Sequence, residues 1–214
     1  GIAGLGFEKL VYDGLGKVFT GIIVAPIGGV LFGVAVTGLI IFFFARRKPA
    51  IVNRTFGRLQ IISSAWFALT HGANDGQKTM GIIVLILFAA DLIPELEMPL
   101  WVIFAAATAM GLGTFFGGYK VIKTLGVKIT RLKPYQGFAA ETSGGLMLAV
   151  FATLGIPAST THAITGTIMG AGSARRIRAV RWKVSRQIIF SWVITIPGAA
   201  GLGALGTYII NLFV

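Results

Sequence analysis

Three charged side chains that lie well inside apolar stretches are the residues of this sequence best placed to do chemistry: Asp75, Lys78 and Glu141. A charge in hydrocarbon costs about 3 kcal/mol or more unless it is paired or hydrated, so such residues are candidates for a functional site. Two other interpretations stay open. Asp75 and Lys78 could form a local ion pair across one helical turn, and Glu141 could simply reach water near a cytoplasmic mouth.

Hydroxyl groups gather in the segment Pro157-Ala-Ser-Thr-Thr-His162. Proline suits the first turn of a helix, so Ser159, Thr160 and Thr161 would stand at a helix start. Unpaired backbone N–H groups, the positive end of the helix dipole and the hydroxyl donors together favour an anion at that place. The alternative is that the hydroxyls cap the helix and bond back to the chain.

The segment Gly72-Ala-Asn-Asp-Gly-Gln-Lys-Thr79 supplies complementary groups. At a helix break, the amide of Asn74, the carboxylate of Asp75 and exposed carbonyl groups can hold a cation. A cation site paired with an anion site is the chemistry of a cation-coupled anion carrier. Because neither segment can satisfy its polar groups in hydrocarbon, we expect Asn74 and Asp75 to lie beside the hydroxyls of 159–161 in a common hydrated cavity.

The composition indicates what surrounds these residues. The chain has 214 residues, of which 55% are hydrophobic and 12% charged, with a mean hydropathy of +0.84. A soluble domain of this length is much less apolar, so we expect an integral membrane protein. The sequence has no Cys, which excludes disulfides and thiolate metal sites. His71 and His162 are then expected to be structural hydrogen-bonding residues, and neither a metal nor a cofactor is predicted.

The basic residues are clustered rather than spread over a face. The net charge is +12, but 16 of the 19 Lys and Arg residues fall in 46–58, 120–133 and 175–186, between apolar stretches. Nucleic acid is therefore not an expected partner. Such clusters beside spans mark cytoplasmic loops, so we expect the loops 46–58, 120–133 and 174–186 on one side. The acidic loop 91–99 is expected on the other side.

These observations predict an all-α integral membrane protein with about five helical segments. Residues 1–19 fit an interfacial segment or a linker, and residues 20–214 form the membrane domain. Ordinary spans are expected at 20–45, 100–118 and 187–213. In the first span, Gly29 and Gly33 have the small-xxx-small spacing that suits close helix packing.

Two further segments are expected to be irregular. An unbroken helix over 59–90 would run roughly 48 Å, longer than a bilayer core, so a helix broken near 72–76 is predicted. Residues 137–172 lie between two cytoplasmic loops and must cross an even number of times. Each half is short and polar, which favours a re-entrant helical hairpin turning at 155–157 over two full spans.

On these motifs the sequence resembles the Pit family of phosphate transporters, whose duplicated signature contains GAND and, further on, P-x-S-T-T-H. The matching segments are His71-Gly-Ala-Asn-Asp-Gly-Gln-Lys-Thr-Met-Gly81, Gly137-Phe-Ala-Ala-Glu141 and Leu154-Gly-Ile-Pro-Ala-Ser-Thr-Thr-His162, and the ending from Val180 is also similar. The resemblance covers essentially the whole chain. It implies a secondary carrier, not an enzyme, that symports inorganic phosphate with a cation and is built from two inverted repeats.

Each motif occurs once, so the chain resembles the C-terminal repeat only, one half of an inverted-repeat transporter. The missing N-terminal repeat, or a second subunit, is then an expected partner. By resemblance, phosphate binding falls to Ser159, Thr160, Thr161 and Asn74, cation coupling to Asp75, Asn74 and Glu141, and supporting roles to Lys78, Thr79 and His162. Many GAND motifs carry a second Asn where this chain has Lys78. Because lysine cannot ligate sodium, the coupling ion stays open between proton and sodium.

The other expected partners are inorganic phosphate, bare or as a neutral metal-phosphate complex, and the lipid bilayer, in a bacterial inner (plasma) membrane. One alternative is a carrier or channel for another oxyanion such as sulfate, which the same donors could accept. The remote alternative is an intramembrane hydrolase using Ser159, His162 and Asp75. That reaction needs a base oriented on an exposed serine, and the adjacent Thr-Thr pair gives it no support.

Overall fold

The computed structural model describes residue 6 and residues 11–212, and the chain is helical over most of this range. The α-helices are α2 (Tyr12–Phe44), α3 (Pro49–Ala89), α4 (Leu100–Lys123), α5 (Pro134–Thr153), α6 (Thr160–Ser173) and α7 (Trp182–Asn211). A π-helical turn, η1 (Thr124–Ile129), and a 3-10 turn, η2 (Ile177–Ala179), complete them. The described residues include no strand, which confirms the predicted all-α class.

Three segments are long and apolar enough to cross a membrane: Tyr12–Phe44, Leu100–Ile129 and Trp182–Asn211. They contain the described parts of the spans expected at 20–45, 100–118 and 187–213, apart from Ala45 and Leu212, and each is longer than expected. Residues 12–19 belong to α2, whereas the rest of the expected segment 1–19, apart from residues 6 and 11, lies outside the described residues. Its role as an interfacial segment or linker stays a prediction.

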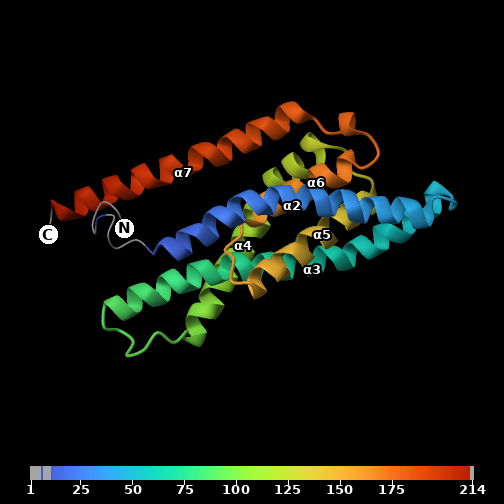
Figure 1. Ribbon diagram of the computed structural model, residues 1–214. Coiled ribbons are helices and arrows are strands. Elements are labelled where there is room, and N and C mark those ends of the chain that lie inside the picture. The colour runs from blue at the N-terminus through green and yellow to red at the C-terminus, as the bar shows by residue number, and fades with distance from the viewer. Residues whose placement is uncertain (1–5, 7–10, 213–214) are drawn as a thin grey trace.

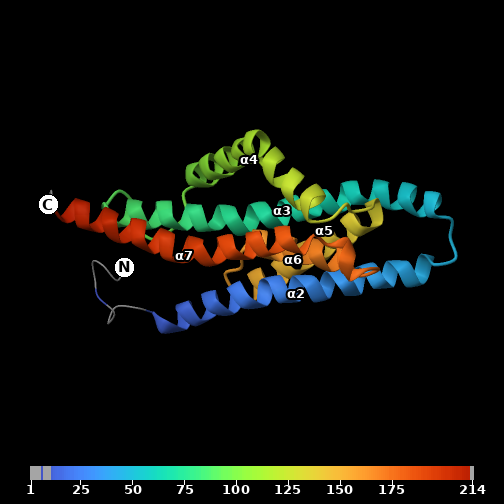
Figure 2. The same cartoon turned by 90° about the horizontal axis from the view of Figure 1, so that it is seen from above.

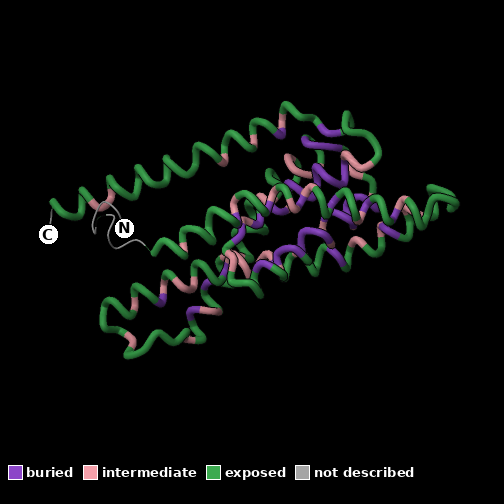
Figure 3. The backbone as a smooth tube through the Cα atoms, in the orientation of Figure 1, coloured by how far each residue is buried: buried purple, intermediate pink, exposed green. Residues whose placement is uncertain are grey.

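The hairpin formed by α5 and α6 lies between the two long helices α2 and α3 (Figures 1 and 2). α6 packs chiefly on α2, and α5 packs chiefly on α3. Burial is concentrated on this hairpin and on the helix faces that meet it, while α7 is exposed over most of its length (Figure 3). The hairpin is therefore the centre of the described structure.

Glycines allow α2 and α6 to approach each other closely. A Cβ atom on Gly29 would lie 2.7 Å from the carbonyl oxygen of Ala163, and one on Gly166 would lie 2.5 Å from that of Pro26. One on Gly33 would meet the carbonyl oxygen of Thr167. Only glycine fits at such backbone contacts, so the packing role expected for Gly29 and Gly33 is confirmed.

The chain turns at Gly155, within the segment 155–157 where Gly155 and Pro157 predict the hairpin turn. Gly155 has φ +62°, and the N–H groups of Gly155 and Ile156 donate to the carbonyls of Ala152 and Phe151 at 3.2 and 2.9 Å. This is a Schellman cap, which ends α5 and turns the chain back. With 14 residues, α6 is about 21 Å long, too short to cross a hydrocarbon core of about 30 Å.

The predicted break near residues 72–76 is wrong, because α3 continues through it without interruption. No glycine of α3 has a positive φ. The carboxamide of Asn74 donates to the carbonyl of Thr70 at 2.9 Å, one turn back in the same helix. The polar residues therefore find partners with the helix intact. The length argument fails as well, since the 41 residues of α3 run about 62 Å and its ends extend past a core of about 30 Å.

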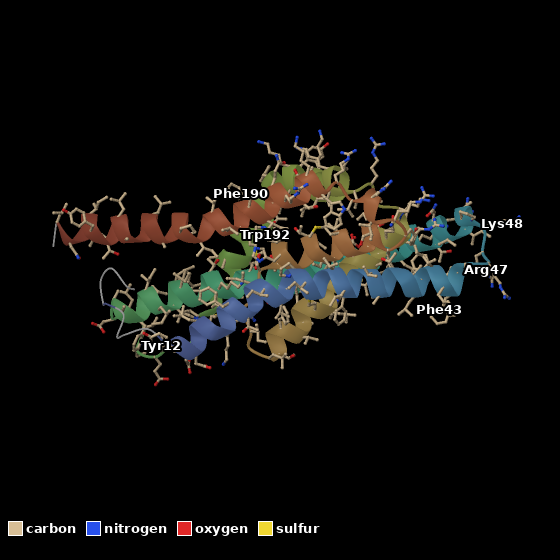
Figure 4. The ribbon with its side chains drawn as sticks, turned by 45° about the horizontal axis from the view of Figure 1, so that its top comes forward. Tyr12, Phe43, Arg47, Lys48, Phe190 and Trp192 are labelled. Atoms are coloured by element: carbon tan, nitrogen blue, oxygen red, sulfur yellow. The ribbon has the colours of Figure 1, made fainter. Side chains whose placement is uncertain are left out.

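The basic loops meet at one end of the helix bundle, since Arg47, Lys133 and Arg175 line a single groove. Figure 4 shows Arg47 and Lys48 at this end. The acidic loop after α3 lies at the opposite end (Figure 1). The expected basic loop 46–58 is mostly helical, because Pro49 starts α3 and only residues 45–48 connect α2 to it.

Candidate functional site

Asp75 joins the two polar motifs. Its Oδ2 accepts a hydrogen bond from the hydroxyl of Thr160 at 2.9 Å, although 85 residues separate them. The same oxygen lies 3.3 Å from Nε2 of His71, one turn earlier in α3, and Oδ1 lies 3.4 Å from Nζ of Lys78. About a third of the Asp75 side chain is exposed, so the carboxylate has neighbours on both oxygens and still reaches the surface.

Lys78 is the second link between α3 and the hairpin. Its ammonium group donates to the carbonyl oxygen of Ala158, in the hairpin turn, at 2.8 Å. The local Asp75–Lys78 ion pair is present, but it is not the whole role of the lysine. Because Lys78 also holds the hairpin turn, it places a positive charge beside the start of α6.

The three hydroxyl residues at the start of α6 have three different surroundings. Ser159 caps the helix, since its hydroxyl accepts from the N–H of His162 at 3.3 Å. Thr160 is 3% exposed and is bound to Asp75, whereas Thr161 is exposed. The capping alternative therefore holds for Ser159. The helix start still offers first-turn N–H groups, a positive dipole end and the Thr161 hydroxyl on its open side.

His162 holds the hairpin against neighbouring helices. Its ring packs on Trp192 of α7 with the centroids 3.9 Å apart, where α7 passes the hairpin (Figure 4). It also faces the backbone of Ile22 in α2. The carbonyl of Ile22 has no helical donor because residue 26 is proline, which lacks an N–H. His162 thus contacts two helices, and its supporting role in the site stays a prediction.

Glu141 occupies a separate polar cluster. Its carboxylate accepts from the hydroxyls of Ser63 and Ser64 at 2.6 and 3.1 Å and from the amide of Gln60 at 3.3 Å. Ser63 lies twelve residues before Asp75 in α3, which is about 18 Å along the helix. Glu141 is therefore not beside Asp75 and Asn74, and the structure does not gather the three expected coupling residues into one site.

Sequence reasoning missed the partners that hold these carboxylates. Gln60, Ser63 and Ser64 recur at the three- and four-residue spacing of one helix face, which was a usable signal for a polar stripe. His71 stands four residues before Asp75, again on one face. Nothing in the sequence signals the Ala158 carbonyl as the partner of Lys78, because that contact depends on the hairpin turn.

The remaining expected residues contribute less. Asn74 is engaged within α3, and Thr79 is exposed on it. A hydrolytic triad is not assembled, since Asp75 binds Thr160 and the His162 ring packs on Trp192. Among the described residues, no group of three or more His, Cys, Asp and Glu side chains could hold a metal ion.

In sequence and in structure, the chain is similar to known phosphate transporters. The model of the phosphate transporter family matches residues 45–203. A probable low-affinity inorganic phosphate transporter of Rhizobium meliloti (strain 1021) is 44% identical over 206 residues, which are 96% of this chain and 62% of that protein. A protein of Bacillus subtilis (strain 168) described in the same words is 39% identical over 212 residues, 99% of this chain and 64% of that protein. The chain thus spans less than two thirds of the length of these relatives.

A solved structure of the sodium-dependent phosphate transporter matches 100% of this chain and 71% of that chain, with a TM-score of 0.83 and 24% sequence identity. At this identity the match shows a shared fold. The bacterial relatives and the three apolar helices fit an integral protein of the inner membrane, as predicted. With the family model matching most of its length, the chain belongs to the phosphate transporter family.

Proposed function

We propose that this chain is part of a secondary transporter that moves inorganic phosphate across the membrane by symport with a cation. In this proposal the chain is the C-terminal repeat, and a second repeat or subunit completes the site. Family membership supports phosphate as the substrate. The single observation that carries the mechanism is the 2.9 Å contact between Thr160 and Asp75, because it joins the groups suited to an anion with those suited to a cation.

The anion would bind at the start of α6. Backbone N–H groups, the hydroxyls of Ser159 and Thr161, and the Lys78 ammonium group all lie on this side of the hairpin turn. A tetrahedral oxyanion suits such a set of donors at a positive helix end. Thr160 would turn its hydroxyl from Asp75 to phosphate when the carboxylate takes up the coupling cation.

The surroundings of Asp75 favour a proton over sodium as that cation. A sodium ion on Asp75 would lie close to the Lys78 ammonium group, which is already 3.4 Å from the carboxylate. Like charges at such a distance repel. Protonation of Asp75 adds no such repulsion, and it would free both Lys78 and Thr160 to contact phosphate. Asn74 would support this exchange from one residue away, and Glu141 would act as a separate acid.

The test is uptake of labelled phosphate by the full-length protein in proteoliposomes. We expect uptake driven by an inward proton gradient without sodium, and little competition from excess sulfate. Uptake driven by a sodium gradient alone would contradict proton coupling. Strong competition by sulfate would favour the broader oxyanion carrier, and dependence on added divalent metal would identify a metal-phosphate complex as the substrate. Release of a hydrolysed product without uptake would instead support an enzyme.

A further inference from the structure

The basic end of the helix bundle contains a groove that the transport site does not use. It is lined by Arg47, Lys133 and Arg175, which come from three different connections between helices, together with polar and apolar residues of α2, α3 and α5. All three cationic side chains are exposed. The ion pairs found among the described residues all lie elsewhere, at Asp13, His71 and Asp75. The groove therefore carries three positive charges without a neighbouring carboxylate.

These charges come from side chains rather than from helix ends. α3 and α5 begin at the groove and would make it more positive, but α2 ends there and α6 ends just before Arg175. Two N-terminal and two C-terminal dipole ends roughly cancel. The positive potential of the groove thus depends on the three cations, which can be removed by substitution.

Part of the remaining lining is apolar and continues onto an exposed apolar surface of α2. Ile40, Ile41 and Phe44 line the groove from α2, which is one of the helices apolar enough to cross a membrane. Phe42 and Phe43, just beside them in α2, are 75% and 72% exposed, and Figure 4 shows Phe43 beside Arg47. The three cationic side chains of the groove thus lie next to an exposed apolar surface of α2.

We propose that this groove binds the phosphate-bearing headgroup of an anionic phospholipid, whose acyl chains lie along α2. The groove has a volume of about 150 Å³, the space of about five water molecules at roughly 30 Å³ each. That volume holds one phosphodiester group, while the chains stay outside on the apolar surface. Basic pockets between membrane helices bind anionic headgroups for the same electrostatic reason. A free phosphate ion would use the cations but not the apolar surface.

The test is lipid binding to the full-length protein, measured by native mass spectrometry after exchange into phosphatidylglycerol or phosphatidylcholine. The wild-type protein should retain phosphatidylglycerol in preference to phosphatidylcholine. The triple variant Arg47→Gln, Lys133→Gln, Arg175→Gln should bind phosphatidylglycerol roughly tenfold to a hundredfold more weakly. A matched triple variant outside the groove lining, Lys120→Gln, Lys123→Gln, Arg186→Gln, removes the same charge and should retain the lipid.

Three outcomes would overturn the proposal. Equal loss in both triple variants would show a diffuse surface charge instead of a site. Displacement of the lipid by millimolar inorganic phosphate would assign the groove to the free anion. Absence of any preference for phosphatidylglycerol would show that the groove does not select an anionic headgroup. The variant Arg47→Lys, Arg175→Lys keeps the charge and should keep the lipid, which separates loss of charge from misfolding.

Discussion

The hairpin is held on its two sides by contacts of opposite character. Along its length, α6 packs on α2 backbone to backbone, with Gly29 and Gly166 filling positions where a side chain does not fit. At its tip, two side chains of α3 reach it, Asp75 through Thr160 and Lys78 through Ala158. The closest contacts of the first side are between backbones, which cannot change partners, whereas each contact of the second is a hydrogen bond that an ion or a proton could replace.

This difference separates a fixed joint from a movable one. Packed backbones have few alternative arrangements, so the α2–α6 contact should stay the same through a transport cycle. A carboxylate with one third of its surface exposed can change partners at little cost. We therefore expect the hairpin to move as one body with α2, and its tip to change contacts with α3.

The largest effect is expected from Gly29→Leu. The new Cβ atom would lie 2.7 Å from the Ala163 carbonyl, which is backbone and cannot rotate away. Overpacking of this kind should destabilise the protein by at least about 3 kcal/mol, so that little folded protein is recovered. Gly38→Leu is the control in the same helix, because Gly38 has open space around its Cβ direction. Monodisperse yield and thermal unfolding in detergent measure both, and equal recovery would mean that α2 and α6 are not a fixed joint.

The next effect is expected from Asp75→Asn, which changes the movable side. Asparagine keeps the shape and can still accept from Thr160, so the unfolding temperature should change little. Coupled phosphate uptake should fall at least about tenfold, because the group that takes up the cation has lost its charge. Asp91→Asn is the control, because Asp91 lies in the acidic loop that follows α3 and not at the hairpin tip. Uptake that keeps its rate and its dependence on the gradient would make Asp75 a structural residue.

The sequence predicted the close packing of the fixed side and the proximity of Asp75 to the hairpin tip on the movable side, and the contact between Asp75 and Thr160 confirms the second prediction. The spacing of Gly29 and Gly33 indicated close packing, and Gly155 with Pro157 indicated the turn, because these signals are local. The individual partners of Asp75 and Lys78, Thr160 and the Ala158 carbonyl, lie 80 residues or more away and have no local signal. The glycines and polar residues of 72–79 were therefore interpreted as a break, although tertiary partners satisfy the polar groups of an intact helix. Likewise, only the register of α3 shows that Glu141 lies away from Asp75.

A smaller effect is expected from Thr160→Val, which removes the hydroxyl that joins the hairpin tip to Asp75 of α3. Valine has nearly the same shape, and the site is 3% exposed, so packing should be kept. Phosphate affinity should weaken by roughly 1–3 kcal/mol, the cost of leaving a buried partner without its hydrogen bond. Thr153→Val is the control, since that hydroxyl bonds within its own helix at 2.8 Å. Equal affinities of the two variants, measured by concentration dependence of uptake, would remove Thr160 from the phosphate site.

The smallest effect is expected from Gly72→Ala, which asks whether α3 stays intact while the tip moves. Gly72 is helical, and its Cβ direction is free of neighbours. Alanine should therefore stabilise the helix by roughly 0.5–1 kcal/mol. If α3 is a rigid surface against which the hairpin tip exchanges contacts, phosphate uptake should be unchanged while the unfolding temperature rises slightly. If α3 unwinds at this glycine during transport, alanine should instead slow uptake without weakening phosphate binding. Gly81→Ala is the matched control, because Gly81 lies further along the same helix and its Cβ direction is equally free of neighbours. A rate loss at Gly72 that Gly81→Ala does not share would place the moving part in α3 as well as in the hairpin.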